Sequence, residues 1–419
     1  MKKNEKVLKW TLAFLIVYTF WGFLIERTIF YSQNAIYAAF LLLFAGFALS
    51  VKLNGGLIFT NRSVSTKWLL YVSLTAIGYL FETTFQYFFF WMSVLFMLSL
   101  GITTRFAYVF PYKVLFYSGC VGMIGTLFEF FFKDLYIVLI TPFFMNSSIL
   151  QSWVIEGHGL SGFTYQLDQN AAILLYLEAV ILYASDKVLP HSLINYKRYI
   201  LLVIITCIML CGKRSFFMLS LFIPLVISVL GKKKPSQLFL IVIVLSGVAI
   251  FIWQLIMANL EYFAQFDFIG RYAQSLMDYQ SGEDVSSGRS DLSSIALRAF
   301  WDNPIIGVGA GQFINYTHAY TDVHNVYLQT LCEQGIFVFI IFLFSITSCF
   351  RYSIHLLKKH SDTSLVNLVK FSLFCQMFYV IYGFSGNPNV NLFGFMMYFS
   401  SIAIIASIKN LNNENHYMY

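Results

Sequence analysis

Long apolar stretches alternate with short polar connections along nearly the whole chain. A helix needs about 20 consecutive apolar residues to cross a bilayer, and twelve stretches approach this length. They run over residues 10–25, 34–51, 68–82, 85–101, 112–132, 169–185, 197–212, 215–230, 237–260, 325–350, 367–384 and 391–408. A further apolar segment, 135–149, is interrupted by Pro142. The pattern predicts an all-α polytopic membrane protein with about 12 transmembrane helices and one half-buried or re-entrant piece.

The composition narrows the class of protein. The chain has 419 residues, of which 58% are hydrophobic and only 11% charged, whereas a soluble domain carries about 25% charged residues. This excludes a soluble enzyme, a disordered chain and a nucleic-acid-binding domain. The net charge of +7 is by itself only a weak indication of an acidic partner.

The positions of the charges indicate the orientation. With both termini in the cytoplasm, the inner segments hold 20 of the 27 Lys and Arg residues, as the positive-inside rule requires. The seven outer cations are Arg27, Lys133, Lys213, Arg214, Arg271, Arg289 and Arg298. The first apolar stretch has no small-residue cleavage site, so we interpret it as a span rather than a signal peptide. We expect a multi-pass protein of the cytoplasmic (inner) membrane with both termini cytoplasmic.

Two outer segments are longer than the other connections, and they divide the chain. Residues 1–260 carry the first nine predicted helices and an outer segment near 133–168; residues 324–419 carry the last three and a cytoplasmic tail. Between them, residues 261–323 form a large extracytoplasmic loop, and loops of this length are often functional. The loop contains eight acidic residues, three arginines and no lysine. Arginine suits bidentate phosphate binding, although simple charge balance against the carboxylates explains the composition equally well.

The second half of this loop contains a predicted helix. Leu292 to Trp301 has helical apolar spacing, Ser290 or Asp291 is a suitable N-cap, and Asn303-Pro304 ends the helix. Arg289 would then lie just before a helix N-terminus, which is an anion-binding position. The glycine run at 307–311 lacks the strand and helix of a phosphate-binding loop, so we favour a tight turn packed against other backbone.

Polar residues also gather where the loop ends and the tenth span begins. His324 precedes that span, and a neutral imidazole near pH 7 is a natural proton acceptor. Glu333 follows inside the span, where a carboxylate is costly unless it is paired or hydrated. Lys213 and Arg214 occupy a tight outer turn between two apolar spans. Each of these residues also has an ordinary interpretation as an interfacial anchor.

The cysteines indicate no metal site. All six lie in apolar stretches without metal-ligand spacing, so we expect them to be small core residues. They are Cys120, Cys207, Cys211, Cys332, Cys349 and Cys375.

Together these residues form a recognisable pattern. It reads Gly288-Arg289, then Arg298-x-x-Trp301-x-x-Pro304-x-x-Gly307-x-Gly309, then His324-Asn325-x-x-Leu328-x-x-x-x-Glu333-x-Gly335. The pattern resembles the O-antigen ligase/polymerase superfamily, which are polytopic glycosyltransferases of bacterial surface polysaccharide assembly. The resemblance covers residues 213–216 and 288–335 by motif, and most of the chain by architecture. It implies a GT-C-like membrane fold.

The resemblance also implies roles for particular residues. In the family, the positions of Arg289, Arg214 and His324 act in catalysis or bind the lipid diphosphate. As further substrate-binding candidates we take Arg298, Asn325, Glu333 and Lys213. The family works without a divalent metal, and no cofactor is expected here, although Glu283 and Asp284 stay open as metal ligands. The implied partners are a polyprenyl-diphosphate-linked oligosaccharide, membrane lipid and, optionally, a chain-length regulator.

The expected function is a polymerase of O-antigen, capsule or exopolysaccharide. It would transfer glycan from polyprenyl diphosphate to a lipid-linked repeat unit at the outer face of the membrane, with inversion by resemblance. One alternative is a ligase that transfers the polymer to lipid A core or another acceptor. An alternative of another class is a flippase or transporter of lipid-linked oligosaccharide, which the intramembrane residues Glu129 and Glu178 keep open.

Overall fold

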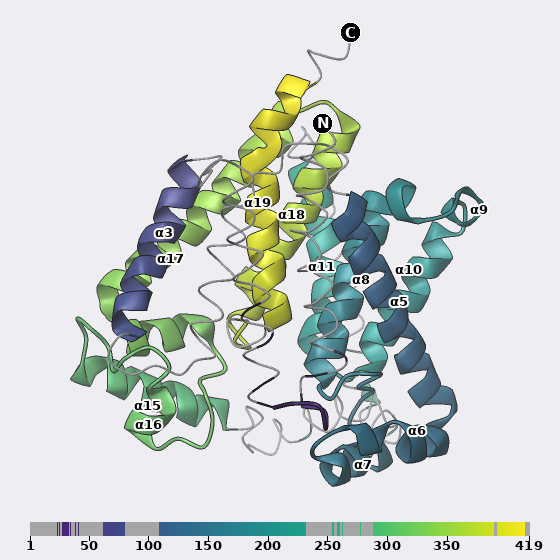
Figure 1. Ribbon diagram of the computed structural model, residues 1–419, viewed down its shortest axis with the longest axis horizontal. Coiled ribbons are helices and arrows are strands. Elements are labelled where there is room, and N and C mark those ends of the chain that lie inside the picture. Colours follow the sequence, from purple (N-terminus) through teal and green to yellow (C-terminus); the bar gives the residue numbers. More distant parts are fainter. Residues whose placement is uncertain are drawn as a thin grey trace.

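The computed structural model describes residues 62–79, 109–231, 288–388 and 392–414, with isolated positions between residues 23 and 41 and between 254 and 277. Apart from such isolated positions, the predicted spans 10–25, 34–51, 85–101 and 237–260 lie outside the described residues. The described part is helical (Figure 1). Three of its helices are long and apolar enough to cross a membrane, namely Tyr112–Phe131, Val326–Lys359 and Thr363–Tyr382. The count of about 12 spans therefore stays a prediction.

The first group of helices is centred on α8 (Leu167–Val188), which is buried around most of its circumference. It packs against α5 (Val109–Phe131), α10 (Lys197–Leu210) and α18 (Thr363–Tyr382). A helix that is apolar on all sides is expected to be surrounded in this way. Gly119 of α5 allows the close approach, because a Cβ atom there would lie 2.4 Å from the Leu177 side chain. α11 (Arg214–Leu230) completes this group, and α9 (His191–Ile194) joins α8 to α10.

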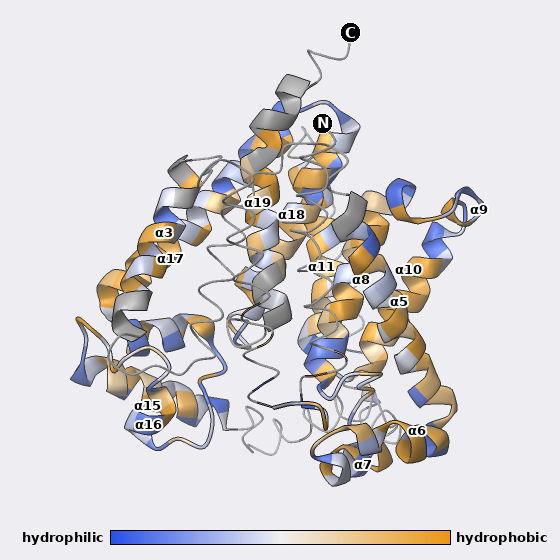
Figure 2. Ribbon diagram, in the orientation of Figure 1, coloured by the Kyte–Doolittle hydropathy of each residue, from blue (hydrophilic) through white to orange (hydrophobic). Residues whose placement is uncertain are grey.

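The second group contains α3 (Arg62–Tyr79), α17 (Val326–Lys359) and α19 (Leu392–Glu414), and α18 lies between the two groups. Trp68 is fully buried at their junction, with its ring against Phe342 of α17 and Tyr398 of α19. Its indole N–H also donates to the Cys349 sulfur, 3.1 Å away. Figure 2 shows hydrophobic residues along the outward faces of α5, α10 and α17, as expected of helices in contact with lipid.

The two predicted outer segments lie at the same end of the molecule (Figure 1), opposite α9 and the C-terminal end of α19. The apolar stretch 135–149 divides at Pro142 into α6 (Lys133–Leu139), the short 3-10 turn η3 (Thr141–Phe143) and α7 (Ser147–Ile155). Thr28 pairs with Phe144 in an antiparallel bridge and so ties the end of the first predicted span to this segment. The other segment contains α15 (Arg289–Asp302) and α16 (Phe313–Thr317).

The start of α15 differs from the sequence prediction. The helix begins at Arg289, and its N-cap is Gly288 in the left-handed conformation (φ 78°), not Ser290 or Asp291. Glycine adopts this conformation without steric cost, and the N-cap lies two or three residues earlier than predicted. Arg289 therefore lies in the first turn of α15. Asn303 ends the helix as predicted.

Candidate active site

The site is organised around the start of α17. The Asn325 side-chain oxygen accepts hydrogen bonds from the backbone N–H groups of Tyr327 (3.0 Å) and Leu328 (3.1 Å). This is an N-cap, which satisfies donors that have no partner inside the helix. Asn325 was predicted to bind substrate, and the structure gives its side chain this supporting role. The cap fixes the backbone next to His324, which is exposed immediately before the helix.

The connection between α18 and α19 joins the loop to this helix start. Three consecutive carbonyl groups accept hydrogen bonds: Gly383 from the Val326 N–H (2.9 Å), Phe384 from the Asn325 side-chain amide (3.4 Å), and Ser385 from the Arg289 guanidinium (3.2 Å). Arg289 precedes His324 by 35 positions, yet Arg289 and the two residues that follow His324 are held against this one short segment. The remaining guanidinium N–H groups of Arg289, which is exposed, are available to an anion.

Two further charged groups act on His324 from other helices. Lys213 is the N-cap residue of α11, and Asp168 lies in the first turn of α8. Partial desolvation lowers the pKa of the His324 imidazole, Arg289 and Lys213 lower it further, and Asp168 opposes them by raising it. A lowered pKa favours the neutral imidazole at pH 7, which is the form that can accept a proton.

The turn that carries Lys213 is positioned by close backbone packing. The Leu160 N–H donates to the Leu210 carbonyl (3.0 Å), and Gly159 approaches Cys211 so closely that a Cβ atom would lie 2.4 Å from the Cys211 carbonyl oxygen. Lys213 is half-buried and Arg214, the next residue, is exposed. Both predicted cations of this turn are thus at the end of the molecule where Arg289 and His324 lie.

Residues 199–343 match the family model described as O-antigen ligase. This region is similar to the O-antigen ligase/polymerase superfamily. It contains all seven predicted site residues, and the resemblance inferred from the motifs is confirmed. Among curated proteins, no sequence matches the chain. Together with the apolar helices, the family match supports a membrane enzyme of glycosyltransferase type.

Within the O-antigen ligase region, the glycine run 307–311 packs against the backbone of α17. We call this contact the seat of the loop. Gly335 interrupts the helix with φ 74°, and backbone groups on both sides of it form hydrogen bonds with the loop. The Ile336 N–H donates to the Pro304 carbonyl, while the Cys332 and Glu333 carbonyls accept from Val308 and Gly309, all at 2.9 Å. The interpretation of the run as a turn packed against backbone is correct.

Glu333 fixes the same seat with its side chain. It is 4% exposed, and its carboxylate accepts from the Phe313 N–H (3.3 Å) and from the Gln329 amide (3.1 Å). Gln329 in turn contacts Asp322 (3.4 Å) and Asn387 of the α18–α19 connection. We had expected Glu333 to bind substrate, whereas its contacts give it a role in positioning α16 and the loop.

Arg298 lies apart from the other predicted site residues of the O-antigen ligase region. It is exposed, and its guanidinium reaches only the Ser294 hydroxyl one turn earlier on α15, at 3.5 Å. Nine residues at 100° each place it on the face of α15 opposite Arg289. No interaction described by the structure links it to His324.

Sequence reasoning missed two residues of the site. In the sequence, Asp168 lies at the end of the predicted outer segment 133–168, and Tyr382 lies inside the predicted span 367–384. The Tyr382 hydroxyl donates to the Asp168 carboxylate at 3.5 Å, and both lie outside the matched region 199–343. Asp168 had one usable signal, since it is an acid that directly precedes a predicted span; Tyr382 had none.

The cysteines and carboxylates of the described residues do not form a cluster suited to a metal ion. Among the described residues, no three His, Cys, Asp or Glu side chains gather as a metal site would require. Five of the six cysteines are buried and Cys120 is partly buried, as expected for core residues. Glu283 and Asp284 lie outside the described residues.

Proposed function

We propose that this protein is a polymerase of bacterial surface polysaccharide. It would transfer glycan from a polyprenyl diphosphate to a lipid-linked repeat unit at the outer face of the cytoplasmic membrane. The observation that carries the proposal is the meeting of a neutral histidine, His324, with the cations Arg289 and Lys213 inside the O-antigen ligase region. A proton acceptor beside a cluster of cations suits a reaction that deprotonates a hydroxyl and releases an anion.

The reaction has a role for each group. The acceptor hydroxyl gives its proton to His324, and its oxygen forms the new bond to the anomeric carbon. The bond from that carbon to the diphosphate oxygen breaks, and its electron pair leaves with the diphosphate. Arg289, Lys213 and the adjacent Arg214 stabilise the departing charge, a task that divalent metals perform elsewhere. Direct displacement of this kind inverts the anomeric centre.

The orientation and the domains follow the same proposal. The site lies at the end of the molecule that the positive-inside rule assigns to the outside. The loop 261–323 is then extracytoplasmic, and both termini are cytoplasmic. Lipid-linked donor and acceptor would reach the site from the outer leaflet. A chain-length regulator is a compatible partner.

A ligase differs from a polymerase only in its acceptor, so it is the main alternative. Transport is supported less, because the contact of Glu129 suits an anchoring role. Glu129 accepts from the Gly162 N–H at 2.7 Å and anchors an outer loop, while Glu178 is buried in α8. An assay with purified protein and lipid-linked oligosaccharide separates transport, which leaves the donor intact, from transfer, which consumes it.

Gene deletion followed by gel analysis of surface polysaccharide tests the proposal. We expect the ladder of polymer lengths to disappear while a single repeat unit is still transferred. Full-length polymer that accumulates on the carrier lipid would instead identify a ligase. An unchanged ladder would refute both.

A further inference from the structure

The proposed reaction places conflicting demands on the surroundings of His324. Cations are needed to hold the diphosphate, but the same cations disfavour a protonated imidazole. Arg289 on α15 and Lys213 before α11 both act on His324 in this unfavourable direction. A proton acceptor in such a place needs a compensating negative charge.

Asp168 supplies that charge from a separate part of the fold. It is the only acidic residue in the first turn of α8, where the N-terminal end of the helix dipole favours a carboxylate. It is half-buried, and among the described residues it is the acid that raises the pKa of His324. None of the motifs of the O-antigen ligase region includes it.

Tyr382 holds this carboxylate in place. Its hydroxyl donates to Asp168 at 3.5 Å, and its ring is fixed by stacking on Phe378 (5.3 Å between centroids) and by contact with Phe216 (4.9 Å). The next three residues are those whose carbonyl groups hold Val326, Asn325 and Arg289. The Tyr382–Ser385 segment thus contacts the acid, the cation and the two residues that follow His324.

We propose that Asp168 is the counter-charge of His324, a positioning residue of the transferase that Tyr382 holds at the site. This inference rests on the proposed function. When the acceptor proton moves to His324, the imidazolium is formed between Arg289 and Lys213, and Asp168 offsets the added positive charge. The role corresponds to that of the aspartate in a Ser-His-Asp triad, which stabilises the imidazolium without taking the proton.

The test measures His324 directly and then measures turnover. Histidine-labelled protein in detergent is titrated by NMR, with His324→Gln used to assign the resonance. We expect Asp168→Asn to move the His324 titration to lower pH by roughly one pH unit and Tyr382→Phe to move it less. Asp302→Asn, which removes an exposed acid at the far end of α15, is the matched control and should leave the titration unchanged.

In the polymerase assay, Asp168→Asn should lower kcat by about 10²-fold or more, with KM for the donor little changed. The acidic limb of the pH–rate profile should move to lower pH together with the His324 titration. An unchanged His324 titration in Asp168→Asn overturns the inference, even if activity is lost, because the role would then be structural. The titration does not depend on catalysis, so failure of the proposed function would appear separately, as a wild-type protein that does not consume the donor.

Discussion

The two outer segments of the molecule are anchored by the same kind of hydrogen bond, but their charged side chains make different contacts. In each, a buried glutamate on a long apolar helix accepts a hydrogen bond from a loop N–H group. Glu129 of α5 accepts from Gly162 at 2.7 Å, and Glu333 of α17 accepts from Phe313 at 3.3 Å. Glu129, one of the two acids that kept a transport function open, is therefore a fixing point for the outer layer, as Glu333 is.

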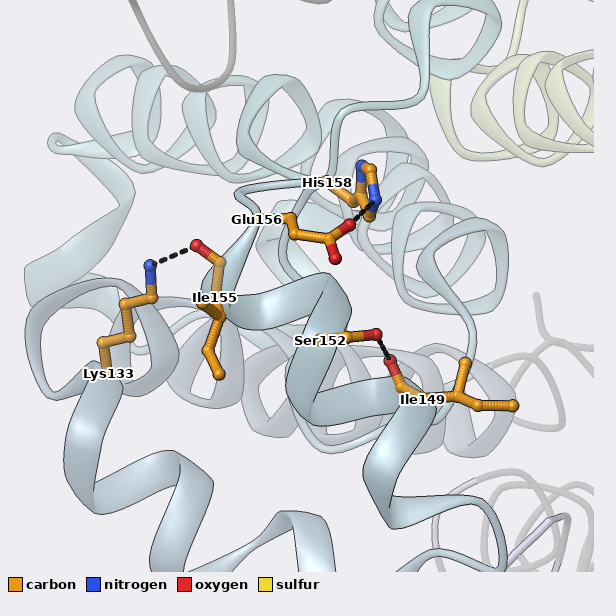
Figure 3. Close-up of polar contacts among 6 residues, drawn as sticks. All are labelled: Lys133, Ile149, Ser152, Ile155, Glu156 and His158. Atoms are coloured by element: carbon orange, nitrogen blue, oxygen red, sulfur yellow. Dashed lines mark hydrogen bonds and ion pairs between the residues drawn. The ribbon is translucent and has the colours of Figure 1, made fainter.

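The two segments differ in the contacts of their charged side chains. Both expose apolar side chains, which in the α15–α16 segment include Trp301, Ile305 and Ile306. The charged side chains of the α6–α7 segment make local contacts: Lys133 reaches the Ile155 carbonyl and Glu156 pairs with His158 (Figure 3). The exposed apolar residues of the α6–α7 segment are Leu135, Val138, Leu139, Phe143, Met145, Ile149 and Ile155. Such a surface suits the membrane interface. In the α15–α16 segment, by contrast, Arg289 contacts the connection between α18 and α19. We infer that the reaction takes place where cations of one segment lie close to groups from other parts of the fold.

The strongest test of this difference removes one cation from each segment in turn. Arg289→Ala should reduce polymer formation by at least about 100-fold, because a preorganised donor at the departing charge is lost. Arg289→Lys should not restore activity, since one point charge cannot contact both Ser385 and a phosphate as the guanidinium fork does. Product is measured with purified lipid-linked donor.

Lys133→Ala is the control in the other segment. Its ammonium group contacts only a backbone carbonyl, at 3.2 Å, and we expect wild-type activity. A fully active Arg289→Ala protein, shown to be expressed and inserted, would contradict the assignment of the site.

The second prediction concerns the seat on which the α15–α16 segment rests. In Gly335→Ala, the new Cβ atom would lie 2.1 Å from the Ile305 carbonyl oxygen, at a backbone φ of 74°. The strain should destabilise the seat by at least about 2 kcal/mol and should speed proteolysis within residues 288–324. Gly231→Ala is the control, because its nearest contact is 3.6 Å; equal protease sensitivity of the two variants would refute this account of the seat.

Sequence patterns predicted the elements of the fold better than the contacts of the site. Continuous apolar runs located α5, α8 and α10 to within a few residues, because a helix surrounded by apolar side chains or by lipid leaves a local signature in the sequence. Arg289 and His324 were singled out because cations are scarce on the outer side and because both residues belong to the motif. Asp168 and Tyr382 were missed because 214 positions separate them, and no local pattern reports a contact formed by packing.

Other residues of the motif make structural contacts, while their predicted binding of substrate stays a prediction. Asn325 and Glu333 belong to the motif, yet their side chains cap and seat α17. A motif records that a residue type is required at a position. It does not distinguish a group that touches substrate from one that holds such a group in place.

The third prediction tests this distinction at Asn325. Removing the cap with Asn325→Ala should lower stability by about 1 kcal/mol and should reduce activity through the displaced His324. Asn325→Ser keeps a capping oxygen and should restore the melting temperature and most of the activity. If the serine variant were as stable as wild type yet inactive, the Asn325 amide would itself contact substrate.

The smallest effect is expected at Arg298. Its substitution tests whether a cation of the α15–α16 segment matters simply because it lies in that segment, or only when it contacts the site. Arg298 shares α15 with Arg289, but it faces the opposite side of the helix and contacts only Ser294. Exposed pairs of this kind contribute little, so Arg298→Ala should change kcat/KM for the donor by no more than about twofold. The comparison with Arg289→Ala is best made at limiting donor, where a lost phosphate contact is most visible. A loss comparable with that of Arg289→Ala would mean that the donor spans both faces of α15, and the site would then extend beyond the groups held by Tyr382–Ser385.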